Sequence, residues 1–151
     1  MRFRFAQHAR RVIATFWVGS LWAVGYVVAP TLFATLYDKV LAGTIAGSLF
    51  RIEAWLSLAC AFLLTVLTWS AAKIEAAPMR TQLKLIGAML GCTLLGYFAL
   101  HPFIAALREA AGPGGVMASE ARLQFGILHG ISSAIYFIQS LIGAALILKL
   151  K

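Results

Sequence analysis

Three ionisable side chains lie inside or close to long apolar stretches of the sequence, where burying a charge is costly. They are Glu53, His101 and His129. Two imidazoles from neighbouring helices can supply axial ligands to a haem, and with a carboxylate they can hold a metal ion such as copper. The same groups could pass protons or bind a quinone headgroup. The sequence therefore marks these three residues as candidate cofactor-binding or metal-binding ligands.

The same residues also have a purely structural interpretation. His129 can hydrogen-bond to Ser133 one turn later, and His101 can simply occupy a helix end before a proline. Arg51 can form an ion pair with Glu53 or Asp38. Under this interpretation the three side chains stabilise the fold and carry no chemistry.

The elements that must position these residues are long and apolar. Of 151 residues, 62% are hydrophobic and 12% are charged, whereas about 25% are charged in a typical soluble domain. A helix needs roughly 20 apolar residues to cross a hydrocarbon core of about 30 Å. The sequence predicts four such spans, at residues 12–37, 47–72, 85–107 and 123–148.

Short connections between the spans predict one compact bundle. We expect a single all-α membrane domain over residues 1–151, an up-down-up-down four-helix bundle with sequential helices antiparallel. Each of the three candidate ligands then lies about six residues, or about 9 Å, inside the same end of the bundle. Glu53, His101 and His129 should therefore lie at one level.

The distribution of the positive charge indicates how the chain is oriented in the membrane. The formal net charge of +8 would suggest nucleic acid in a soluble protein, but these charges fall in short clusters between apolar stretches, which excludes a nucleic-acid module. Under the positive-inside rule, both termini are cytoplasmic and the protein is a multi-pass protein of a bacterial inner membrane. The basic residues on the cytoplasmic side are Arg2, Arg4, Arg10, Arg11, Lys73, Arg80, Lys84, Lys149 and Lys151.

Two further features of the spans have simple interpretations. The first span is too long for the apolar region of a cleaved signal peptide, so we expect an uncleaved anchor. Cys60 and Cys92 lie within spans, where a structural disulfide is not expected and small packing residues are.

Small residues recur at helical spacing and predict close helix packing. We interpret three GxxxG pairs as contacts within the bundle, with self-association of two chains as the alternative. The pairs are Gly43 with Gly47, Gly87 with Gly91, and Gly126 with Gly130.

Three segments resemble a known family. VGSLWAVGYVVAPTLFATL, LAGTIAGSLFRIEAW and FGILHGISSAIYF are similar to the transmembrane-protein-205-like family, whose bacterial members are called domain of unknown function 4149. The resemblance covers residues 18–137 and implies a small four-span helical protein, distantly similar to copper-resistance CopD-like proteins and to a haem-binding protoporphyrinogen oxidase group. It names no activity. The residues that carry it are Pro30, Phe33, Ala42, Gly43, Gly47, Phe50, Arg51 and His129.

Three functions remain open at this point. The first is binding of haem or a metal ion, copper for example, at Glu53, His101 and His129. The second is a membrane interaction protein that supports assembly or quality control of other membrane proteins and has no chemistry of its own. The third is a small transporter that acts as an oligomer. The partners are the lipid bilayer and either a second copy or another membrane protein. Short loops argue against an enzyme with a soluble substrate.

The predicted orientation can be tested by cysteine labelling. A membrane-impermeant thiol reagent added from the periplasmic side should react with a cysteine placed at Gly114 and should not react with one placed at Ala77. Labelling at residue 77 alone would reverse the topology.

Overall fold

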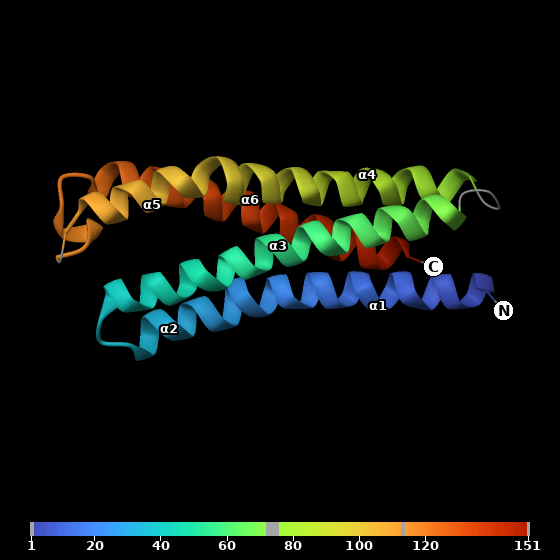
Figure 1. Ribbon diagram of the computed structural model, residues 1–151, viewed down its shortest axis with the longest axis horizontal. Helices are drawn as coiled ribbons and strands as arrows, with labels where there is room; N and C mark the ends of the chain where they lie inside the picture. Colours follow the sequence, from blue (N-terminus) through green and yellow to red (C-terminus); the bar gives the residue numbers. More distant parts are fainter. Residues whose placement is uncertain (1, 72–75, 113, 151) are drawn as a thin grey trace.

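The computed structural model describes residues 2–71, 76–112 and 114–150, and its four long helical rods run antiparallel to their neighbours (Figure 1). Both ends of the chain lie at one end of the bundle, here called the termini end; the opposite end is the loop end. The elements are α1 (Arg2–Trp22), η1 (Ala23–Val28), α2 (Ala29–Thr35), α3 (Lys39–Ala71), α4 (Ala76–Thr93), η2 (Leu94–Leu100), α5 (His101–Ala110), η3 (Val116–Ala118) and α6 (Arg122–Lys149).

Four helical segments are long and apolar enough to cross a membrane, which confirms the predicted all-α class and the number of spans. They are Ala6–Thr35, Lys39–Ser70, Met79–Ala110 and Arg122–Lys149. Large apolar side chains such as Phe62 and Phe137 are exposed on the outside of the bundle, as expected for surfaces that contact lipid acyl chains.

The second span begins earlier than the sequence predicted. Helix α3 starts at Lys39, and not near Gly47, because the Asp38 carboxylate accepts hydrogen bonds from the backbone N–H of Val40 (2.8 Å) and Leu41 (3.0 Å). These are backbone donors that the first turn of a helix would otherwise leave unpaired. A sequence search for uncharged stretches passes over this start because Asp38 and Lys39 interrupt the apolar pattern.

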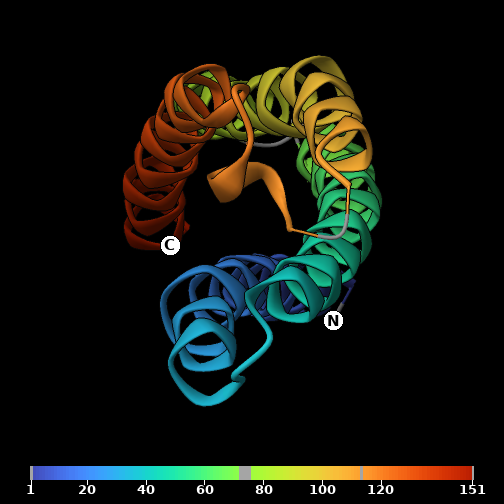
Figure 2. The ribbon, with the colours of Figure 1, turned by 90° about the vertical axis from the view of Figure 1, so that its left-hand side faces the viewer.

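The four rods form an arc when the bundle is viewed from the loop end (Figure 2). Helix α1 packs against α3, α3 against α4, and α4 against α6, and α6 also contacts α1. At the termini end these contacts enclose a compact apolar core. Its buried residues are Ala14, Trp17, Val18, Cys60, Ala61, Leu64, Ile86, Met89, Leu146 and Leu150.

Both the first and the third span contain a π-helical segment at the middle of the bundle. Segments η1 and η2 each include a Gly-Tyr pair, Gly25-Tyr26 and Gly96-Tyr97, and each is followed closely by a proline, Pro30 or Pro102. Proline has no N–H to donate and crowds the preceding turn. The wider π-helical turn accommodates this local defect, and such segments often occur at functional sites.

The glycine pairs do not all pack as predicted. No neighbouring atom lies within 4 Å of a Cβ built at Gly87, Gly91, Gly126 or Gly130, so the interpretation of these two pairs as contacts within the bundle was wrong. The GxxxG spacing puts both glycines on one helix face but does not say whether that face looks inward.

Candidate functional site

A cavity of about 350 Å³ occupies the loop-end half of the bundle and is lined by residues of all four rods. Its walls are mostly apolar, with Phe33, Phe50, Ile104 and Ile135 among the lining side chains. This volume is at the small end of the range found for ligand sites in proteins.

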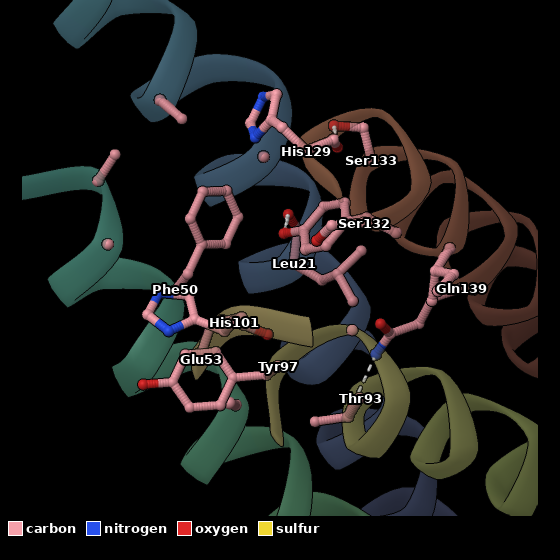
Figure 3. A pocket seen from close by; sticks show the side chains of 18 of the residues that line it. Leu21, Phe50, Glu53, Thr93, Tyr97, His101, His129, Ser132, Ser133 and Gln139 are labelled. Carbon is pink, nitrogen blue, oxygen red and sulfur yellow. Dashed lines mark hydrogen bonds between the residues drawn. The ribbon is translucent and has the colours of Figure 1, made fainter. Parts of the chain in front are cut away.

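A layer of hydrogen-bonded side chains forms the floor of the cavity. The Trp17 indole N–H donates to Ser57 Oγ at 2.7 Å, and both side chains are buried. Thr93 Oγ1 accepts from Gln139 Nε2 at 2.9 Å, the contact dashed in Figure 3. Below this layer lies the compact core, so the cavity is closed toward the termini end.

Glu53 lies beside this floor and is only 5% exposed. Its Oε1 accepts a hydrogen bond from the Ser20 hydroxyl at 3.3 Å. Contrary to one of the sequence-based interpretations, no ion pair joins Glu53 to Arg51 among the described residues, and Arg51 is itself exposed. A buried carboxylate in a membrane-spanning helix is a functional candidate because its burial is costly.

All three candidate ligands line this cavity, but their side chains do not converge. The His101 ring lies against Tyr97 with centroids 4.6 Å apart, whereas His129 stacks on Phe125 at 5.6 Å. In Figure 3 the two imidazoles are well separated, with the Phe50 ring between them in the view. No group of three or more His, Cys, Asp or Glu side chains suited to a metal ion occurs within the described ranges. Their role as ligands stays a prediction.

The hydrogen bond expected between His129 and Ser133 involves the backbone. Ser133 Oγ donates to the carbonyl oxygen of His129 at 2.8 Å, which leaves the imidazole out of this contact. His129 and Ser133 are both exposed and both line the cavity, so they lie at its rim.

Arg108 is a cavity residue that the sequence reasoning missed. Its Nη1 donates to the Gly43 carbonyl at 2.9 Å, and its guanidinium lies 5.5 Å from the centroid of the Phe125 ring. The third span was expected to end at Leu107, but α5 continues to Ala110. The seven-residue spacing from His101 puts both residues on one helix face and was the available signal.

Gly43 and Gly47 make the space that Arg108 and His101 occupy. A Cβ at Gly43 would lie 3.4 Å from Arg108 Nη2, and one at Gly47 would lie 3.6 Å from Nη1 and 3.9 Å from His101 Nε2. This pair therefore does lie inside the bundle, as predicted. Its partners are two polar side chains, so the glycine spacing serves the cavity and not a close approach of two helix backbones.

Tyr136 joins α6 to the first π-helical segment. Its hydroxyl donates to the Leu21 carbonyl at 2.6 Å, the carbonyl that regular α-helical pairing would give to the Gly25 N–H. Only glycine fits at position 25, because a Cβ there would lie 2.3 Å from the Tyr136 ring. Tyr26 donates in turn to Ser140 Oγ at 2.8 Å.

The cavity opens sideways between α2 and α6. Helix α2 packs against η1 and α3, whereas α6 packs against α1, α4, α5, η2 and η3. Lining residues on both sides of this gap are exposed, Tyr26 by 47% and Phe33 by 40% on one side and His129 on the other.

Segment η3 covers the loop end of the bundle. It lies inside the arc in Figure 2. Its first residue, Val116, is buried, and a Cβ at the preceding Gly115 would lie 2.9 Å from the Val40 side chain at the start of α3. The remaining opening of the cavity therefore faces the surroundings of the bundle at the level of α2.

The Tyr136 contact can be tested by removing its hydroxyl. Tyr136→Phe should lower the stability by about 1 kcal/mol, because the Leu21 carbonyl loses its donor in apolar surroundings. Thermal unfolding in one detergent at one heating rate measures this. Tyr37→Phe is the control, since Tyr37 is fully exposed. Equal unfolding midpoints for both variants would contradict the assigned contact.

A family model matches most of the chain. The model is described as Domain of unknown function (DUF4149) and covers residues 12–113. This range holds Glu53, His101 and Arg108, whereas His129 and Tyr136 lie beyond it. No curated protein and no solved structure matches the chain.

Proposed function

Because the chain belongs to this DUF4149 family, whose description gives no activity, we propose a function from the site: the protein binds an amphiphilic small molecule within the membrane. The observation that carries the proposal is the cavity, which is closed at its floor, lined by all four membrane-spanning rods and open to the side. Apolar cavities with a few placed polar groups are the usual form of small-molecule sites.

The level of the cavity supports a ligand drawn from the bilayer. His129 lies 20 residues before Lys149 along α6, a rise of about 30 Å, which is the thickness of a hydrocarbon core. Gln139, at the cavity floor, lies about halfway. The cavity thus spans one leaflet, from the membrane surface to the middle.

The surface end of the cavity differs in chemistry from its walls. Arg108, His101 and His129 lie toward the surface end, and Phe33, Phe50 and Ile135 provide apolar walls. A molecule with a polar head and an apolar body matches this arrangement. Its head would move from the membrane surface to polar side chains, and its body would move from lipid acyl chains to apolar walls.

The orientation and location follow from the charges. In this proposal the termini end faces the cytoplasm, since the basic clusters lie there, and the cavity lies in the outer leaflet of a bacterial inner membrane. The similarity to transmembrane-protein-205-like and CopD-like proteins stays a prediction.

The binding of haem or a metal ion is the second candidate, favoured by the shared lining position of Glu53, His101 and His129. The positions of the imidazoles weigh against it: the His101 ring lies against Tyr97 and the His129 ring stacks on Phe125, whereas ligands of one metal would have to direct their ring nitrogens to one point. Roles as an assembly factor or as an oligomeric transporter stay predictions.

Filling the cavity tests the proposal. Gly96 lines the cavity, and a Cβ there would already lie 3.6 Å from Ile135, so Gly96→Leu should occupy the ligand volume. Native mass spectrometry of the protein released from a neutral detergent should show a bound molecule near one per chain in the wild type and its loss in Gly96→Leu. The adduct mass and a visible spectrum would identify haem or metal if either is the ligand.

Gly130→Leu provides the matched control, because Gly130 lies in a membrane-spanning helix with no neighbour within 4 Å and its variant should keep the adduct. Absence of any adduct from the wild type, or its retention in Gly96→Leu, would contradict the proposed function.

A further inference from the structure

We infer that the ligand is an amphiphile with an anionic head group, a carboxylate or a phosphate, and that Arg108 binds this group. The inference deepens the proposed function and rests on it. It is carried by the charge, the contacts and the position of Arg108 at the surface end of the cavity.

Arg108 has no acidic partner in the described part of the chain. At the loop end, the Asp38 carboxylate caps the first turn of α3, and the Glu109 and Glu120 side chains are exposed. Glu53 is engaged with Ser20 by the floor. The half-buried guanidinium therefore has no counter-charge among the described residues, and an anionic ligand would supply one.

The contacts of the Arg108 guanidinium leave N–H donors available for a ligand. One N–H donates to the Gly43 carbonyl, and the guanidinium carbon lies over the Phe125 ring. Arginine carries five N–H donors in a fixed fork that matches a carboxylate or phosphate with two parallel hydrogen bonds. Gly43 and Gly47 leave the space in which this group lies.

The two imidazoles add to the same end of the cavity. His101 and His129 both line it, and each shares a neighbour with Arg108: Gly47 for His101 and the Phe125 ring for His129. A ring N–H from either could donate to the remaining oxygens of the anion. The end of the cavity nearest the membrane surface is therefore rich in donors.

Arg108 sets the direction of the ligand. Its guanidinium lies at the surface end of the cavity, so the anion is expected there and the chain toward the middle of the membrane. A lipid in a leaflet has this orientation already. The side opening between α2 and α6 lets such a molecule move in from the bilayer without turning over.

Three probes with a twelve-carbon chain distinguish the contribution of the head-group charge to binding from that of the chain. Dodecanoate, dodecyl phosphate and dodecanol share the chain and differ in the head group, and inorganic phosphate has the charge alone. Binding is measured by native mass spectrometry of the full chain in neutral detergent. Wild type should prefer the anionic chains over dodecanol by roughly 10- to 100-fold, the range of one charge-assisted hydrogen bond.

Variants at Arg108 locate the preference. Arg108→Gln should abolish the preference for the anionic chains and Arg108→Lys should retain part of it, whereas Arg122→Gln, which changes an exposed arginine at the same end, should leave it unchanged. The ratio of two ligands on one sample does not depend on how much protein is folded, so a destabilised variant still gives a result.

The outcomes separate the two proposals. If all three probes bind the wild type equally, or if Arg108→Gln keeps the preference, the inference of an anionic head group is wrong. The proposed binding of an amphiphile in the cavity then still stands. If none of the chains binds, the proposed function fails as well. If inorganic phosphate binds as tightly as dodecyl phosphate, the chain contributes nothing and the inference of an amphiphilic ligand is wrong. Of dodecanoate and dodecyl phosphate, the one that binds more tightly shows whether the head group is a carboxylate or a phosphate.

Discussion

The structure depends on one constraint: a polar group inside a membrane must find its partner within the bundle, because lipid offers none. At the floor of the cavity the partners are side chains, as in the contact between Trp17 and Ser57. At the wall, the Tyr136 hydroxyl donates to the Leu21 carbonyl near the end of α1, just before the π-helical segment η1. Arg108 meets this constraint only in part, since one backbone carbonyl accepts from it and no described acid compensates its charge.

The two halves of the bundle are built differently. The termini half is closed by apolar packing around Trp17 and Leu64. The loop half contains both π-helical segments and the prolines that follow them. The cavity lies in the half that contains these local departures from regular helix, and Gly25, Tyr26, Gly96 and Tyr97 of the two π-helical segments line it.

The sequence was sufficient to predict the helical class and the four spans, because hydropathy and helix length follow directly from composition. It also singled out Glu53, His101 and His129, which line the cavity, since an ionisable residue in an apolar stretch is visible without a structure. Their role as ligands stays a prediction. The sequence missed Arg108, which lies one residue beyond the predicted end of a span. It also misjudged Gly126 and Gly130, because spacing gives a helix face and only tertiary packing decides where that face points.

The central claim, a membrane cavity that holds an amphiphile, is tested most directly by photolabelling with a diazirine fatty acid, followed by peptide mapping. The account predicts labelling concentrated at the cavity-lining residues Ile135 and Phe50 and suppressed by unlabelled dodecanoate. Labelling spread over the exposed lipid-facing residues Phe137 and Ile138, with no effect of the competitor, would contradict it.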